Sequence, residues 1–270
     1  MIKQVHRLLS VAALSFALLL SNKLIAQDVT PLVPVAAPIP AGLETVEIFS
    51  PAVDRRMKFD IVLPANYYQS DERYPVLYLL HGYMQNYTVW GRNLAAAFYA
   101  RNLNDLILVL PDGGNSWFIN YASSTEGQKD NWEDHIIEDV IAHVDANYRT
   151  EARREGRAIA GLSMGGFGAF SMGLRHPDMF VSIGSTSGAL SHARTAAAAI
   201  RAGIDRGPGA RDEERQARID EADAFISKII DMPGFSTQDD RTPKGIDFET
   251  PEQAEAYDPF AIIYNVPRSQ

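Results

Sequence analysis

The residues best suited to chemistry form the run Gly161-Leu-Ser163-Met-Gly165. A serine hydroxyl attacks an acyl carbon when a base takes its proton and when it projects from the fold towards the substrate. A sharp turn from a strand into a helix provides that projection, and a glycine two residues to either side relieves the crowding of the turn. An apolar run precedes Ser163 and small residues follow it. The pattern therefore predicts that Ser163 is the nucleophile of an acyl transfer.

A second run, Tyr78–Tyr83, places His81 and Gly82 directly after an apolar strand. Hydrolases with a serine on this kind of turn take one oxyanion donor from the residue after the serine and the other from a loop after an early strand. We therefore expect the backbone N–H groups of Tyr83 and Met164 to be the two donors. In such hydrolases the base follows the nucleophile in the chain, so we interpret His81 as structural.

Three further residues have a spacing that could hold a metal. His135, Asp139 and His143 recur at intervals of four along a predicted helix over 132–148. They flank the apolar stripe of that helix, so we interpret them as a solvated helix face. No metal and no cofactor is predicted.

Two tryptophans bracket a loop rich in glycine, asparagine and serine. Trp117 and Trp132 could line an acyl or aromatic pocket or could belong to the core, and the sequence favours neither. Trp117 is the candidate substrate-binding residue. Asp112 follows a predicted strand, where ligands gather in open α/β sheets, but a role in the turn is the preferred interpretation.

The elements that must position these residues alternate between strands and helices. Continuous apolar runs predict strands buried on both faces, which is typical of a parallel sheet covered by helices. Partial alternation predicts two antiparallel edge strands at the start of the domain. The order of elements predicts a doubly wound, mostly parallel α/β sheet. The predicted strands are 43–49, 57–63, 76–80, 106–110, 158–161 and 181–185, and the predicted helices before Ser163 are 94–100 and 132–148.

The first 42 residues have a different character. Residues 1–26 combine Lys3 and Arg7 with an apolar run that is too short to span a bilayer, and they predict a cleaved signal peptide. Residues 27–42 are proline-rich and predict an extended tether. The hydrolase domain is expected over 43–270, with a cap insertion at 191–250. A secreted or periplasmic protein, with no membrane attachment after cleavage, is the expectation.

Charge and composition exclude several classes of function. The 270-residue chain has a formal net charge of −9 and no cysteine. An acidic surface without basic runs does not suit nucleic acid, whose phosphates are held by clusters of Lys and Arg. The absence of cysteine excludes disulfides, thiolate metal sites and a cysteine nucleophile.

Four longer blocks carry a resemblance to a known family: Tyr74–Gly82, Val109–Trp117, Ala160–Gly166 and Arg175–Asp178. They resemble the esterase D branch of the α/β-hydrolases, which includes tributyrin-type, feruloyl and acetyl-xylan esterases, S-formylglutathione hydrolase and the antigen 85 mycolyltransferases. The resemblance implies an α/β-hydrolase fold and an acyl-serine intermediate on Ser163. Its expected substrates are small-molecule or polysaccharide esters, with short acyl chains or with the acetyl and feruloyl groups of plant polysaccharides. An acyltransferase is a close variant.

The resemblance also implies an acid and a histidine on later strands. The chain stops at Gln270, so we expect the domain to lack its final strands and helix. Two histidines follow Ser163: His176 lies at the far end of the predicted nucleophile helix, and His192 follows a strand whose end faces the site and could approach it. Without a base we expect little turnover. The chain is then either an incomplete esterase or a protein without catalysis. The second alternative is an inactive fragment, or a relative that keeps the hydrolase scaffold and binds carbohydrate or protein.

Overall fold

The computed structural model describes residues 42–103, 105–124, 127–204 and 242–266, all within one compact unit, Pro38–Gln270. The predicted signal peptide, nearly all of the predicted tether and most of the predicted cap lie outside the described residues. In the described part of the chain, no helix combines the length and the apolar composition needed to cross a bilayer.

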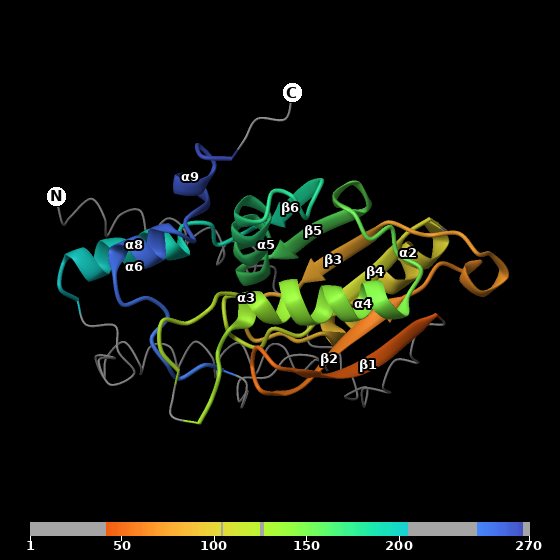
Figure 1. Ribbon diagram of the computed structural model, residues 1–270, viewed down its shortest axis with the longest axis horizontal. Coiled ribbons are helices and arrows are strands. Elements are labelled where there is room, and N and C mark those ends of the chain that lie inside the picture. Colours follow the sequence, from red (N-terminus) through yellow and green to blue (C-terminus); the bar gives the residue numbers. More distant parts are fainter. Residues whose placement is uncertain (1–41, 104, 125–126, 205–241, 267–270) are drawn as a thin grey trace, which may run out of the picture. The chain divides into compact units, whose positions relative to one another are not determined.

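In the residues that the structure describes, six strands form one sheet in the order β1-β2-β4-β3-β5-β6 (Figure 1). The pairs β1–β2 and β2–β4 are antiparallel, whereas β3–β4, β3–β5 and β5–β6 are parallel. The doubly wound, mostly parallel sheet is confirmed. Only β1 of the two antiparallel strands is at an edge, because β2 also pairs with β4. The strands are β1 Leu43–Ser50, β2 Arg55–Val62, β3 Val76–Leu80, β4 Ile107–Pro111, β5 Arg157–Leu162 and β6 Ser182–Thr186.

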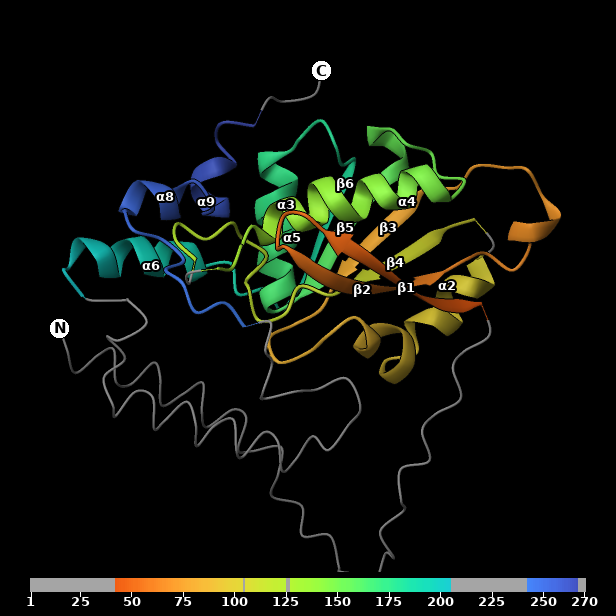
Figure 2. The same cartoon turned by 60° about the horizontal axis from the view of Figure 1, so that its bottom comes forward.

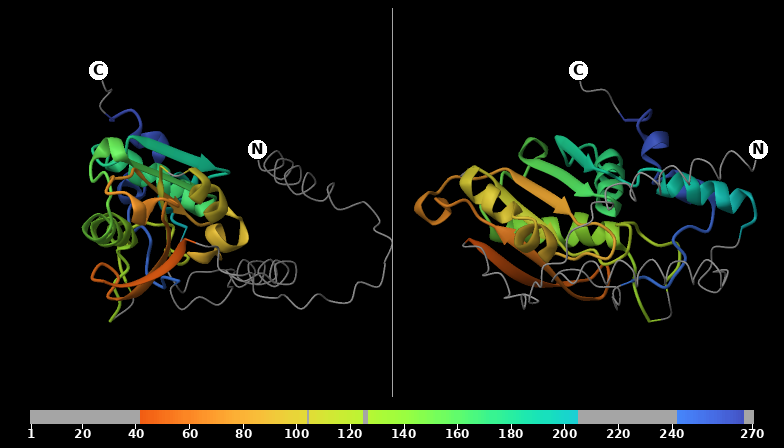
Figure 3. Two further views of the ribbon diagram at one scale, coloured as in Figure 1. Left: turned by 90° about the vertical axis from the view of Figure 1, so that its right-hand side faces the viewer. Right: turned by 180° about the vertical axis from the view of Figure 1, so that it is seen from behind.

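Both faces of the central strands are buried. Ile107 and Val109 pack in the largest core cluster with residues of the helices that precede and follow β5, whereas Leu108 and Leu110 pack with Ala97 and Ala100 of α2 (Ala96–Leu103). Successive side chains of a strand point to opposite faces, so a continuous apolar run needs cover on both sides. Figure 2 shows that cover, with α4 (Ile141–Asn147) and α2 on opposite sides of the strands, and the end-on view of Figure 3 shows the same layers.

The helical segments that the structure describes include two π-helices. A π-helix, Val89–Asn93, precedes α2, and another, His135–Val140, separates α3 (Trp132–Asp134) from α4. The remaining elements are the 3-10 helices Tyr67–Gln69 and Arg154–Gly156 and the helices α5 Met164–Arg175, α6 His192–Arg201, α8 Pro251–Glu255 and α9 Pro259–Ile262.

The strand order fixes where a site can form. The chain passes from β3 to β4 on one side and then returns to place β5 on the other side of β3. Ligands bind at such a switch point, outside the carboxyl ends of the strands. The loops that follow β3, β4 and β5 therefore meet at one edge of the sheet, and these loops carry the predicted site residues. At the other end of this strand order, β6 is the edge strand of the described sheet.

Candidate active site

Ser163 lies in the turn between β5 and α5, as the sequence predicts. Its backbone has φ 52° and ψ −112°, a conformation that a serine adopts only under constraint. Hydrogen bonds supply the constraint: Ser163 N donates to Thr186 O at 3.1 Å, and Ser163 O accepts from Phe167 N and Ala189 N at 3.0 Å each. The residue as a whole is half-buried.

The two glycines of the motif permit this turn because each lies against backbone. A Cβ on Gly161 would lie 2.3 Å from the carbonyl carbon and oxygen of Gly165. A Cβ on Gly165 would lie 2.5 Å from His81 O and 2.6 Å from Leu80 O. The first turn of α5 therefore packs directly on the end of β3, and this contact brings the loop after β3 next to Ser163.

That loop forms a turn from Gly82 to Gln85, closed by Gln85 N donating to Gly82 O at 3.2 Å. Met84 has φ 64°, a value that the third residue of a type II turn requires and that favours glycine. Gly82 N donates to Gln85 Oε1 at 2.8 Å, and Met84 N donates to Asn115 Oδ1 at 2.7 Å. The predicted donor residue, Tyr83, lies between these two fixed peptides.

Left-handed backbone collects at this edge of the sheet. Met84, Trp117, Phe118, Ser163 and Ser187 all have φ between 50° and 64°, and each follows the carboxyl end of a parallel strand. Such conformations cost free energy in residues other than glycine, and they gather at functional sites where the surrounding structure holds them.

An aromatic group surrounds the serine turn. The Trp117 ring stacks on the His192 ring, with centroids 3.6 Å apart and an angle of 6°, and it also contacts Tyr83 and Phe167 at 6.3 and 5.9 Å. Trp117 is half-buried. It therefore belongs both to the packing of the core and to the surroundings of Ser163. Trp132, by contrast, is fully buried and is a core residue.

His192 begins α6 close to the serine turn. His192 N donates to Ala189 O, and Ala189 N donates to Ser163 O, each at 3.0 Å. Its Nε2 lies 4.0 Å from Asp247 Oδ2. The sequence indicated that His192 could approach the site, but nothing in the sequence singled out Asp247, which lies in a polar stretch far along the chain.

The interpretation of His135, Asp139 and His143 as a solvated face is wrong for His135. Its side chain is 1% exposed, with Nδ1 2.9 Å from Ser50 Oγ and Nε2 donating to Asp112 O at 3.2 Å. The chain after β1 covers this turn of the helix, since Asp139 accepts hydrogen bonds from Ser50 Oγ and Ala52 N. Burial lowers the pKa of His135 to about 4. Both ring nitrogens contact protein groups, which leaves neither for a metal.

His176 lies at the far end of α5, as predicted. Its Nε2 donates to Glu133 Oε1 at 2.7 Å, and Arg175 Nε donates to the same oxygen at 2.9 Å. Burial alone raises the pKa of Glu133, but the hydrogen bonds from His176 and Arg175 outweigh it and the pKa is lowered. This cluster anchors α5 to α3, away from the serine.

Asp112 and Asn115 hold the loop after β4, and the sequence predicts only a turn role for Asp112. Asp112 is fully buried and its Oδ1 accepts from Gly114 N at 3.0 Å, which confirms its role in the turn. Asn115 was not singled out from the sequence, although it lies within the block Val109–Trp117 that resembles the family. Its contact with Met84 N joins the loops after β3 and β4.

The comparisons with known proteins agree with this architecture. Residues 50–260 match the sequence profile of the family described as "Putative esterase". An esterase of Mycobacterium tuberculosis is 39% identical over 139 residues, which are 49% of this chain and 29% of that protein. An endo-1,4-beta-xylanase/feruloyl esterase of Xylanibacter ruminicola is 32% identical over 157 residues, 54% of this chain and 22% of that protein. The chain thus spans less than a third of the length of these two relatives.

A solved structure supports the fold. The S-formylglutathione hydrolase of Agrobacterium tumefaciens superposes with a TM-score of 0.56 at 16% identity, over 84% of this chain and 72% of that one. The serine turn, the strand order and the profile match over most of the chain all lead to the same assignment. This chain belongs to the esterase D-like family of α/β-hydrolases.

Proposed function

We propose that the protein is a carboxylic ester hydrolase in which Ser163 Oγ attacks the acyl carbon and forms an acyl-serine intermediate. The acyl–oxygen bond of the ester breaks in this step, the alcohol leaves with the proton that the serine loses, and water then hydrolyses the acyl-serine to the acid and free Ser163. The observation that supports this role is the strained, half-buried Ser163 at the start of α5. A serine needed only for packing would relax to an ordinary conformation, because a left-handed backbone costs a residue with a Cβ about 1 kcal/mol or more.

Two backbone amides are the proposed oxyanion donors. Met164 is the first residue of α5, and the first amides of a helix have no partner within the helix. The helix dipole adds partial positive charge at the same end. Tyr83 comes from the loop after β3, which the contact at Gly165 holds against α5. Negative charge that develops on the substrate oxygen would then be stabilised by groups that are already oriented.

The aromatic group defines the proposed acyl site. Trp117 and Tyr83 face each other across 6.3 Å, and flat rings of this kind suit an acyl chain or an aromatic acid such as a feruloyl group. The named activity of the Xylanibacter relative includes feruloyl esterase. We therefore propose esters of plant polysaccharides or short acyl esters as the substrates. We also propose that the first 26 residues direct the protein to export. Product partition in the presence of an added alcohol separates this hydrolase from an acyltransferase.

The test is covalent labelling with a fluorophosphonate. The probe is expected to modify the wild-type protein at Ser163, identified by mass spectrometry of the labelled peptide, and to leave Ser163→Ala unmodified. Ser182→Ala is the matched control, since Ser182 is an exposed serine of β6, and it should label as the wild type does. Modification of another residue, or equal labelling of Ser163→Ala, would refute the proposal.

Two further variants address the proton acceptor. His192 lies beside Asp247 and is joined to the serine turn through Ala189. If His192 takes the proton, His192→Gln slows the labelling of Ser163 by at least a factor of ten and Asp247→Asn slows it less. If labelling is slow in the wild type and unchanged in both variants, the base is a group other than His192.

A further inference from the structure

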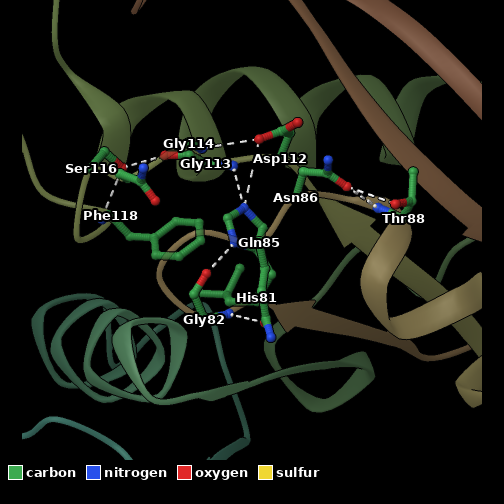
Figure 4. Close-up of polar contacts among 12 residues, drawn as sticks. His81, Gly82, Gln85, Asn86, Thr88, Asp112, Gly113, Gly114, Ser116 and Phe118 are labelled. Atoms are coloured by element: carbon green, nitrogen blue, oxygen red, sulfur yellow. Dashed lines mark hydrogen bonds and ion pairs between the residues drawn. The ribbon is translucent and has the colours of Figure 1, made fainter. Parts of the chain in front are cut away.

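His81 is a fully buried histidine whose two ring nitrogens each contact backbone. Nδ1 lies 2.8 Å from Gly82 O, and Nε2 lies 3.0 Å from Gly113 N (Figure 4). A backbone amide can only donate, so Nε2 accepts from Gly113 and carries no proton. The proton of the neutral ring is therefore on Nδ1, which donates to Gly82 O. Gly113 thus fixes the tautomer that Gly82 requires.

The charged neighbour of the ring supports the same assignment. Asp112 Oδ1 lies 3.6 Å from Nε2, which is too far for a hydrogen bond, and it accepts from Gly114 N at 3.0 Å instead. No proton on Nε2 is needed to satisfy this carboxylate.

The carbonyl that His81 holds shares a peptide plane with the proposed oxyanion donor. The Gly82–Tyr83 peptide is trans, and in a trans peptide the C=O and N–H bonds point in opposite directions within one rigid plane. A hydrogen bond that holds Gly82 O towards His81 therefore aims Tyr83 N–H away from His81. We propose that His81 is a positioning residue for the oxyanion hole, which sets the direction of the Tyr83 N–H through the carbonyl of Gly82. This inference rests on the proposed function.

The neighbouring peptides are fixed by other groups. Gln85 Oε1 accepts from Gly82 N and Asn115 Oδ1 accepts from Met84 N, at 2.8 and 2.7 Å. The only other contact that restrains the Gly82 carbonyl among the described hydrogen bonds is the longer one from Gln85 N, at 3.2 Å. Loss of the Nδ1 donor would remove the shorter of these two bonds to the Gly82 carbonyl, so the Gly82–Tyr83 plane would be held less firmly.

Two variants separate positioning from packing. In His81→Asn the side-chain amide nitrogen stands the same number of bonds from Cβ as Nδ1, so the donor to Gly82 O is retained and the acceptor for Gly113 N is lost. In His81→Gln the amide oxygen matches Nε2, so the acceptor is retained and the Nδ1 donor is lost. Both variants disturb the packing of the ring against Phe118, whose centroid is 5.4 Å away.

The experiment measures the second-order rate constant for fluorophosphonate labelling of Ser163 in the full chain, together with the midpoint of urea unfolding. We expect His81→Asn to label within about fivefold of the wild type and His81→Gln to label about 100-fold more slowly, the loss found when one oxyanion donor is removed. Equal rates in the two variants, both folded, would overturn the inference. Wild-type labelling that is unaffected by Ser163→Ala would instead refute the proposed function.

A second measurement does not depend on the folding of a variant. In ¹⁵N-labelled wild-type protein, the ¹⁵N shifts of the His81 ring are expected to show a proton on Nδ1 and none on Nε2. Formation of the phosphonyl adduct is expected to move the Tyr83 amide proton downfield. A ring protonated on Nε2, or a Tyr83 amide signal unchanged by the adduct, would overturn the inference.

Discussion

Replacement of Gly165 by alanine tests the contact on which the whole site depends. An added Cβ would lie 2.5 Å from His81 O and 2.6 Å from Leu80 O. Carbon and carbonyl oxygen approach no closer than about 3.3 Å even in attractive contacts. The start of α5 and the end of β3 must therefore separate by roughly 0.8 Å. Both sides of the contact are backbone, so no side chain can rotate to relieve it.

Two effects follow from that separation. Overpacking of a buried contact costs about 1–3 kcal/mol, and we expect a value near the upper limit for Gly165→Ala because neither side can adapt. The proposed donors Met164 and Tyr83 lie on opposite sides of the same contact. A displacement of about 1 Å can reduce a rate by roughly 100-fold, so we expect Ser163 to label about 100 times more slowly in the folded protein.

The assay combines urea unfolding with the rate of fluorophosphonate labelling below the unfolding transition. Gly184→Ala is the control: its Cβ in β6 would meet the side-chain carbon Cβ of Ala160 at 3.0 Å, and it is expected to cost less than about 1 kcal/mol with no change in labelling. If Gly165→Ala has wild-type stability and wild-type labelling, the close approach of α5 to β3 is wrong. Lower stability with unchanged labelling would show that this contact does not set the donors.

Two predictions concern stability alone. Ala95 is exposed with φ 58°, so Ala95→Gly is expected to raise the free energy of unfolding by about 1 kcal/mol. The same change at the exposed Ala142 inside α4 is expected to lower the free energy of unfolding by about 1 kcal/mol. A loss of stability at both positions would contradict the left-handed backbone at Ala95. Because the folded pKa of Glu133 is lowered, its ionised form stabilises the fold above its unfolded pKa of about 4.5, and this contribution is lost as the pH falls through the folded pKa. We therefore expect Glu133→Gln to cost about 2 kcal/mol at pH 7, because its bonds to Arg175 and His176 are weaker. The cost is expected to shrink as the pH falls below 4.5 and through the folded pKa, as urea unfolding at a series of pH values would show. A cost independent of pH would contradict the charge-assisted pairing.

The central strands β3 and β4 were predictable because runs of consecutive apolar residues mark strands that are covered on both faces. Val76–Leu80 was predicted with the bounds that the structure has, and the other strands within two residues at each end. A strand covered on both faces needs an apolar side chain at every position, and that requirement leaves a continuous signal. The nucleophile turn was predictable for a related reason, since Gly161 and Gly165 are needed by the backbone itself.

The face of the helix that starts at Trp132 was not predictable in the same way. The apolar stripe identified the helix but placed His135 at its solvated border, whereas Ser50 and Ala52 cover this turn from about 85 residues away in the chain. The helix begins after the N-cap Asn131, and the buried Asp130 before it accepts from Trp132 Nε1. Polar residues that satisfy each other across distant segments leave no local pattern.

The small residues of α5 do not all have the packing role that the sequence indicates. The small residues of α5 predict close packing of the helix on the sheet, and at Gly165 that is what they provide. A Cβ on Gly168, however, would lie 2.8 Å from Phe118 Cβ, and a Cβ on Gly113 would lie 2.1 Å from the Phe118 ring.

These two glycines, one in the helix and one in the loop after β4, make the space that Phe118 fills. Phe118 is fully buried, and its backbone is left-handed, as is that of its neighbour Trp117. Burial of the Phe118 ring offsets the cost of two consecutive left-handed residues, and it fixes the backbone from which Trp117 reaches His192 and Tyr83. The proposed substrate-binding ring is thus positioned by a core residue, and the slot for that residue exists only once the helix and the loop have come together.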